Sequence, residues 1–193
     1  MVTIDVTRDL IADAHALRAE RDRQFHNRDR YARTGVEERW TGDLGELTAC
    51  LWFGREGVPA RWYKRQPAGT CDFRVRRADV EIKTRCGATR PHPHYGVGMS
   101  VDHAHRIACD FYLFMCFEEH AARMWIPGAL ARNRFLYYAE LLPKGSRPYG
   151  WNHELTEDRL EVPIARLTEA PEWLRQLEQD WSVRNDHSTQ IFL

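Results

Sequence analysis

The sequence predicts a single α/β domain of 193 residues. Apolar and polar residues alternate with a period of two in the segment 70–85, which is typical of two neighbouring β-strands. The segment 111–117, FYLFMCF, is apolar throughout, as in a strand that is buried on both faces. Apolar residues recur at helical spacing in the segments 41–54 and 171–181. Predicted helices together with a strand that is buried on both faces favour an α/β fold, in which helices pack on the faces of a sheet.

The first forty residues are expected to be helical. Residues 7–33 contain neither Pro nor Gly and are rich in Arg, Asp, Ala and Glu, so we expect a helix that ends at Thr34-Gly35. Leu10, Ala14 and Leu17 lie on one side of this helix, so we expect its first half to pack on the domain. The alternative is an arm that reaches a partner subunit or DNA.

A second helix is expected over residues 41–54, where Leu44, Leu47 and Leu51 share one side. Asp43 is a candidate N-cap with Glu46 three residues later, which is a variant of the capping box. Glu46 has a second interpretation, as a carboxylate that points from the helix N-terminus towards the strands that follow.

Three strands follow this helix, at residues 61–65 and in the two arms of the hairpin 70–85. With Arg77 and Ala78 as the turn, Asp72 pairs with Lys83, and Asp72, Glu81 and Lys83 share one face. The opposite face of the hairpin is apolar and consists of Phe73, Val75, Val80 and Ile82.

The rest of the chain is expected to contain a loop, 86–98, and a short helix that begins after Ser100 as N-cap. Further elements are expected in the order strand 111–117, strand 123–126, helix 129–135, loop 143–150, strand 160–164 and helix 171–181. We divide the domain into an N-terminal helical extension, 1–40, a catalytic core, 41–127, and C-terminal additions, 128–193.

Composition and charge exclude some classes of protein. No apolar run is long enough for a transmembrane helix, and the N-terminus lacks the apolar core of a signal peptide, so we expect a cytoplasmic protein without membrane contact. The five cysteines include no CxxC pair and are expected to be free thiols. Lys and Arg equal Asp and Glu at 28 each, but the segment 55–90 is basic, which suits a phosphate backbone.

The polar face of the hairpin suggests metal chemistry. Two carboxylates, Asp72 and Glu81, are hard oxygen ligands that suit Mg²⁺, and a bound Mg²⁺ polarises a phosphodiester and lowers the pKa of a water molecule. The ammonium group of Lys83 would position or deprotonate the nucleophile and offset charge on the phosphate. The alternative is an edge hairpin with salt bridges from Asp72 to Lys83 and from Glu81 to Arg74.

In order and spacing, these residues resemble the PD-(D/E)xK nuclease superfamily, whose fold is restriction-endonuclease-like. The resemblance covers about residues 41–126: Asp72 matches the acid of the second strand, Glu81-Ile82-Lys83 the tripeptide of the third, and Glu46 the acid of the first helix. Cys71 stands where the family's eponymous proline would be, and that proline is often missing in the superfamily. The helix 101–106 lacks the Q-x-x-x-Y signature of the recombination exonucleases, so the pattern is closer to Holliday-junction resolvases and to phage or restriction endonucleases.

The resemblance implies an endonuclease that hydrolyses double-stranded or branched DNA with Mg²⁺, or with Mn²⁺ in its place, and that commonly forms a homodimer. Asp72, Glu81 and the Ile82 carbonyl would bind the metal, Lys83 would act on the water, and Glu46 would hold a second metal or a bridging water. The residues expected to contact nucleic acid are Lys64, Arg65, Arg74, Arg85 and His103.

Three alternatives remain open. The chain could be an inactive DNA-binding or assembly module on the same fold, although all four catalytic positions are filled, and it could act on RNA. The Cys- and His-rich segment 86–109 could bind zinc, but His103-x-His105 would place two rings on different faces of a helix. Cys109 and Cys116 flank or lie in the apolar strand and are interpreted as small core residues rather than as nucleophiles.

Overall fold

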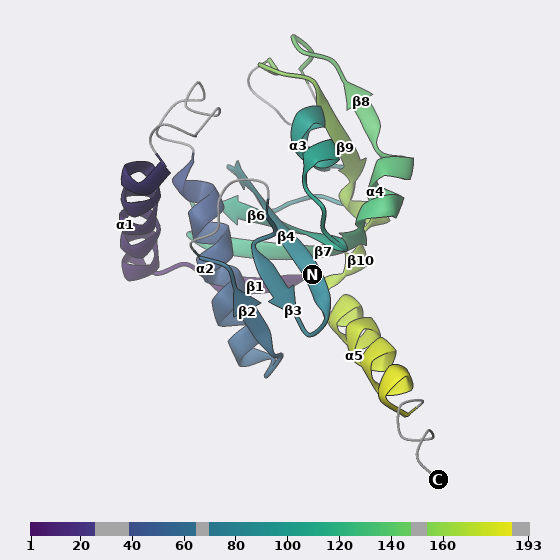
Figure 1. Cartoon of the computed structure of the whole chain (residues 1–193). Coiled ribbons are helices and arrows are strands. Elements are labelled where there is room, and N and C mark those ends of the chain that lie inside the picture. The colour runs from purple at the N-terminus through teal and green to yellow at the C-terminus, as the bar shows by residue number, and fades with distance from the viewer. Residues whose placement is uncertain (26–38, 65–69, 148–153, 187–193) are drawn as a thin grey trace.

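The computed structural model describes residues 1–25, 39–64, 70–147 and 154–186. In these ranges the chain is an α/β fold built on a seven-stranded mixed sheet, with the order β1-β7-β6-β4-β3-β2 and with β10 paired to β7. A second sheet of three strands has the order β5-β9-β8. Figure 1 shows α1 and α2 on one side of the large sheet, and α3 together with the small sheet beyond the end of β4.

The N-terminal strand β1, Val2–Asp5, is absent from the sequence prediction, which made this region part of a helical extension. It pairs antiparallel with β7 and buries Ile4. Helix α1, Arg8–Phe25, packs on α2 and buries Ala14 and Leu17, as predicted for its first half. The predicted continuation to residue 33 lies outside the described residues.

Helix α2, Trp40–Arg55, confirms the predicted helix, but Asp43 is not its N-cap. The helix begins one turn earlier, Arg39 occupies the cap position without a side-chain cap, and the Asp43 carboxylate binds arginine side chains of α1 instead. Gly45 lies directly against the sheet, because a Cβ atom there would lie 1.8 Å from Thr84 Oγ1. The absence of a side chain at Gly45 lets α2 approach β4 closely.

The three predicted strands form an antiparallel meander of β2, Ala60–Trp62, β3, Phe73–Val75, and β4, Ala78–Gly87. The predicted turn is wrong by one residue: Val75 pairs with Ala78, so Arg76 and Arg77 form the turn, with Arg76 at φ 55°. Partners therefore shift by two residues, which preserves the face of every side chain.

The predicted cross-strand partners change with the register, because Arg74 lies opposite Asp79 rather than Glu81 and forms an ion pair with it at 2.8 Å. The apolar face is confirmed, since Phe73, Val75, Val80 and Ile82 all belong to one core cluster with residues of α2 and α5.

The crossover from β4 to the central strand contains an unpredicted strand, β5, Gly96–Ser100, in a segment expected to be mostly loop. Helix α3, Val101–Arg106, has Ser100 as its N-cap, and Ser100 Oγ accepts the His103 N–H at 3.3 Å, as predicted. The buried strand is confirmed as β6, Phe111–Glu118, which lies parallel to β4 in the centre of the large sheet.

The C-terminal part departs from prediction at its strand ends. Strand β7, Arg123–Ala131, continues through Pro127 and Gly128, where the sequence predicted an end, so that α4, Arg132–Tyr138, begins three residues late. Gly128 packs against the backbone of the short strand β10, Thr168–Glu169. Strand β8, Glu140–Leu142, was not predicted, whereas β9, Arg159–Pro163, was.

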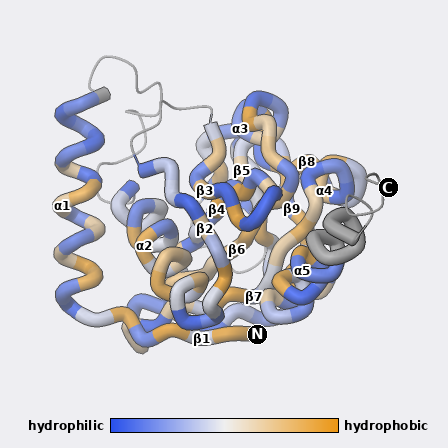
Figure 2. The backbone as a smooth tube through the Cα atoms, turned by 60° about the horizontal axis from the view of Figure 1, so that its bottom comes forward, coloured by the Kyte–Doolittle hydropathy of each residue, from blue (hydrophilic) through white to orange (hydrophobic). Residues whose placement is uncertain are grey.

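The last helix, α5, Ala170–Asp186, buries Trp173, Leu174 and Leu177 as predicted. Two hydrophobic cores result, one between the large sheet and α1, α2 and α5, and the other between its opposite face and β5, α3, α4 and β9. Figure 2 shows the hydrophobic residues concentrated along the inner strands and the hydrophilic ones along much of α1.

None of the five cysteines, all of which lie in the described ranges, forms a disulfide. Among the described helices, none combines the length and the apolar character that crossing a membrane requires.

Candidate functional site

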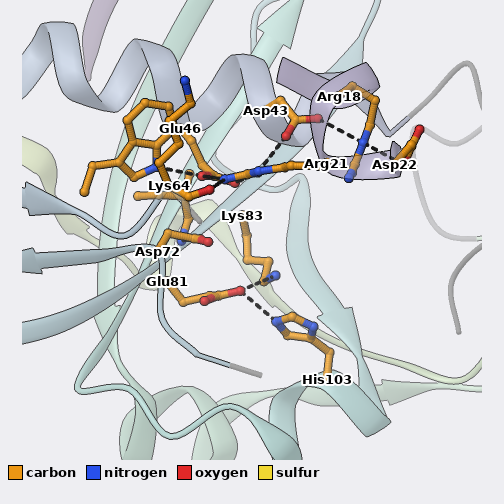
Figure 3. Close-up of polar contacts among 12 residues, drawn as sticks. Arg18, Arg21, Asp22, Asp43, Glu46, Lys64, Asp72, Glu81, Lys83 and His103 are labelled. Carbon is orange, nitrogen blue, oxygen red and sulfur yellow. Dashed lines mark hydrogen bonds and ion pairs between the residues drawn. The ribbon is translucent and has the colours of Figure 1, made fainter. Parts of the chain in front are cut away.

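The predicted catalytic residues meet where β3 and β4 separate. Strand β3 pairs with β4 only from Phe73 to Val75, whereas β4 continues to Gly87. Just before β3 begins, Asp72 Oδ2 accepts the backbone N–H of Ile82 at 2.8 Å. The Asp72 carboxylate therefore takes the place of a paired strand at this edge of β4, and Figure 3 shows it between Glu46 and Glu81.

Glu81 is buried on β4 and is held by two cationic or polar partners. Its Oε1 atom contacts Lys83 Nζ at 2.8 Å and His103 Nε2 at 2.9 Å, while Oε2 is buried without a hydrogen-bond partner among the described residues. Burial alone would raise the pKa of Glu81, but the Lys83 ammonium and the His103 hydrogen bond outweigh it and lower the pKa. Glu81 is therefore ionised at neutral pH.

Asp72 is shifted in the opposite direction. Burial and the negative charges of Glu81 and Glu46 raise the pKa of Asp72 well above its usual value, and Lys83 and the Ile82 N–H only partly oppose this. The pKa values of these two neighbouring carboxylates are thus shifted in opposite directions, as in sites where titratable groups act on one another.

His103, predicted to contact nucleic acid, lies with its ring against Glu81. Burial and the neighbouring Lys83 lower the pKa of His103. The ring is therefore neutral at pH 7, and its Nε2–H donates to Glu81 when the proton is on that nitrogen. Figure 3 shows that α3 brings this ring to the carboxylate from the side opposite Glu46.

Glu46 belongs to a second cluster that sequence reasoning missed. Arg21 of α1 donates to Glu46 Oε1 at 2.6 Å and to Oε2 at 2.7 Å, and it also reaches Asp43 Oδ1 at 2.6 Å. Trp62 Nε1 donates to Glu46 Oε2 at 2.8 Å. Burial raises the pKa of Asp43 to about 6, although Arg18 and Arg21 oppose this rise. Both oxygens of Glu46 are thus occupied by donors of the chain.

The predicted nucleic-acid contacts are dispersed around this site. Lys64 Nζ lies 3.9 Å from a Glu20 oxygen and 5.8 Å from the centroid of the Trp62 ring. Arg74 pairs with Asp79, and Arg85 donates to the Gly96 carbonyl at 2.9 Å. Arg65 lies outside the described residues.

The segment proposed as an alternative zinc site shows a different arrangement. The rings of His92 and His94 lie tilted against each other, with centroids 5.1 Å apart, whereas His103 contacts Glu81. Within the ranges the structure covers, no group of three or more His, Cys, Asp or Glu side chains is arranged to hold a metal ion. A Mg²⁺ site of two carboxylates, a carbonyl and waters needs no such group.

Comparisons of the chain with models of protein families, with curated proteins and with solved structures found no match. The site itself offers two carboxylates of opposite pKa shift, an ammonium group at 2.8 Å from one of them and a neutral imidazole at 2.9 Å from the same oxygen. These groups can bind a hard cation and a phosphate, and they can position a water molecule.

Proposed function

We propose that the protein is a Mg²⁺-dependent endonuclease that hydrolyses phosphodiester bonds in DNA. The observation that carries the proposal is the meeting of Asp72, Glu81 and Lys83 at the edge of β4, where β3 ends. The sequence of α2, the meander β2 to β4, α3 and a strand β6 parallel to β4 supports a restriction-endonuclease-like core. We infer the family from this order together with the matched residues.

The residues present fit a hard divalent cation. Glu81 has a buried oxygen without a partner among the described residues, and burial together with the negative charges of Glu81 and Glu46 raises the pKa of Asp72 at the same place. Asp72, Glu81 and the Ile82 carbonyl would hold the ion. When bound, Mg²⁺ would polarise the phosphodiester and lower the pKa of a water molecule.

The chain's own groups supply the other requirements. The Lys83 ammonium, fixed by Glu81 at 2.8 Å, offsets charge on the phosphate and orients the attacking water. His103 keeps the Glu81 carboxylate in one orientation and is a positioning residue. Glu46 would join as a ligand of a second ion or of a bridging water only if Arg21 withdrew, since both of its oxygens accept hydrogen bonds.

The substrate proposed is double-stranded or branched DNA, as for a junction-resolving or restriction-type enzyme. Arg74, Arg85 and Lys64 lie on strands or a turn around the carboxylates and would contact the phosphate backbone. A homodimer would allow paired cuts in the two strands.

The test is cleavage of a supercoiled plasmid and of a four-way DNA junction with Mg²⁺ or Mn²⁺. We expect the wild-type protein to cut, and Lys83→Ala to lower the rate by about 10²–10⁴-fold because the water loses its positioning group. Lys144→Ala, in an exposed loop after β8, is the control and should cut normally. Wild-type protein that shifts DNA in a gel without cutting would favour an inactive DNA-binding module, and cleavage of RNA alone would change the substrate.

A further inference from the structure

Arg21 of α1 lies in the candidate site as a fixed cation. Its Nη1 atom donates to Glu46 Oε1 and to Asp43 Oδ1, each at 2.6 Å, and its Nη2 atom donates to Glu46 Oε2 at 2.7 Å and to the Lys64 carbonyl at 3.3 Å. Figure 3 shows the side chain reaching from α1 to these two carboxylates of α2. Each terminal nitrogen of a guanidinium group carries two hydrogens, so the chain itself uses all four. Arg21 therefore keeps no terminal N–H for a phosphate.

This cation is shielded from solvent together with its partners. The relative exposure of the side chain is 16 % for Arg21, 10 % for Glu46 and 1 % for Asp43. Burial alone would lower the pKa of this guanidinium group, but Glu46, Asp43 and Asp72 outweigh it and raise the pKa. The charge of Arg21 is therefore permanent, and it acts on Asp72 as well as on the two acids that it contacts.

Glu46 has little capacity left for a metal ion. Its Oε2 atom accepts from both Arg21 and Trp62, at 2.7 and 2.8 Å, which uses the two lone pairs of that oxygen. Its Oε1 atom also accepts from Arg21. A Mg²⁺ ion on Oε1 would lie about 2.0–2.1 Å from that oxygen and next to the guanidinium group, so the two positive charges would repel each other. An ion at Glu46 would thus have to displace Arg21.

The other side of the site, at Asp72 and Glu81, has room for a cation. Glu81 Oε2 is buried without a hydrogen-bond partner among the described residues. Asp72 accepts the Ile82 N–H but forms no ion pair with a described residue, and Lys83 pairs with Glu81 at 2.8 Å. These two carboxylates thus have one ammonium group in contact with them. A divalent ion would add the positive charge that Arg21 already supplies at Glu46.

We propose that Arg21 takes the place of a second metal ion in this site. The site then binds a single divalent ion, at Asp72 and Glu81, and Glu46 is an anchor for α1 rather than a metal ligand. The inference deepens the proposed nuclease function and rests on it, because it concerns the same site. Arg21 is a positioning residue: it fixes Glu46 and supplies positive charge near Asp72, but it does not touch the substrate.

The first experiment is a calorimetric titration of the metal-free protein with Mn²⁺ in the absence of DNA, so that ions are counted without cleavage. We expect wild type to bind one ion and Glu46→Gln to bind one ion as well. Asp72→Asn should weaken the binding of this ion by about 100-fold or more, because the loss of an outer partner alone costs about 10–100-fold and Asp72 is a direct ligand.

The second experiment changes the cation of the chain. Arg21→Met removes the charge and every donor, so Glu46 and Asp43 become free to bind metal, and we expect two Mn²⁺ ions. The double variant Arg21→Met/Glu46→Gln should bind one ion again, and so should Arg21→Lys, which keeps the positive charge. Arg23→Met, at an exposed position of α1, is the matched control and should bind one ion. A role of Arg21 in folding alone would not change the number of ions.

Thermal unfolding with and without Mn²⁺ accompanies the titration, because the loss of Arg21 also destabilises the fold. A second bound ion should raise the unfolding temperature of Arg21→Met more than that of wild type at the same Mn²⁺ concentration. If Arg21→Met does not fold even with Mn²⁺, wild type and Glu46→Gln decide: one ion in each supports the inference, and two ions that fall to one overturn it.

The outcomes separate this inference from the proposed function. Two ions in wild type and one in Glu46→Gln overturn the role of Arg21 but leave the nuclease proposal standing. Equal numbers of ions in wild type and in Arg21→Met overturn that role as well. No ion in wild type, with one gained in Arg21→Met, refutes the metal site of the nuclease but supports the role of Arg21.

Discussion

Arg21 of α1 holds both carboxylate oxygens of Glu46 of α2, with N–O distances of 2.6 and 2.7 Å. This ion pair links α1 to Glu46, the residue that the family resemblance implies to be a catalytic acid. Trp62 donates to the same carboxylate from β2, so three elements meet at one side chain. The N-terminal helix α1 therefore contacts the candidate site directly through Arg21.

Loss of this ion pair should destabilise the fold. Arg21→Gln removes the cation that the buried carboxylates of Glu46 and Asp43 share, and breaking a buried pair costs about 3–5 kcal/mol. Urea unfolding followed by tryptophan fluorescence measures the free energy of unfolding. The control is Arg175→Gln, which breaks an exposed pair with Glu172 on α5 and should cost about 1 kcal/mol or less. Similar losses in the two variants would contradict a buried role for Arg21.

Removal of the charge at Asp72 should stabilise the metal-free protein, and this stabilisation should grow as the pH rises. An acid whose pKa is raised on folding binds its proton more tightly in the folded state, so its effect on stability becomes unfavourable above the ordinary pKa of an aspartate. Asp72→Asn removes this effect, and the Asn oxygen can still accept the Ile82 N–H.

Thermal unfolding in EDTA between pH 4 and pH 8 provides the measurement. Asp72→Asn should match wild type at the acidic end and exceed its unfolding temperature increasingly towards neutral pH. Asp79→Asn, on the polar side of the same hairpin, is the control and should show no such divergence. If Asp72→Asn were less stable than wild type at pH 8, the ionised Asp72 carboxylate would not destabilise the metal-free fold.

His103 should tune cation binding without touching the cation. His103→Ala removes one of the two groups that fix Glu81 Oε1, and loss of such an outer partner lowers metal affinity by about 10–100-fold. Titration with Mn²⁺ by calorimetry measures this directly. His105→Ala, on the exposed side of the same helix, should bind as wild type does. Equal affinity in all three proteins would remove His103 from the site.

The contact between α2 and β4 gives a test of packing. Gly45→Ala should destabilise by about 1–3 kcal/mol, because its Cβ atom would collide with Thr84 Oγ1, and this loss exceeds the gain in helix propensity. The second change Thr84→Ala, which removes that oxygen, should restore most of the stability. Gly54→Ala in the same helix meets nothing within 4 Å and should be neutral or stabilising by about 1 kcal/mol. Chemical denaturation of the four proteins decides the matter, and a stabilised Gly45→Ala would refute the close approach.

The central hairpin and the buried strand could be predicted because their signals are local. A period of two fixes the face of Glu81 and Lys83 whatever the turn, which is why a turn displaced by one residue left the site intact. The continuous apolar run of β6 identified the strand that lies between two others.

The remaining features depend on partners distant in sequence. Strands β1, β5 and β8 are short, and each is defined by pairing with a segment more than 15 residues away. The role of Arg21 could not be predicted either, because an arginine in a charged helix gives no local sign of the carboxylate it will meet. Asp43 resembled a helix cap for the same reason: its partners lie on α1.

The hydrogen bond from the Ile82 N–H to Asp72 also has a protective role. An exposed strand edge recruits strands from other molecules, and native proteins place charges there to prevent this. Asp72→Ala would leave that amide without its acceptor and would open this edge of β4 to pairing with another chain. In the proposed nuclease, metal binding and the protection of this strand edge would thus depend on a single carboxylate.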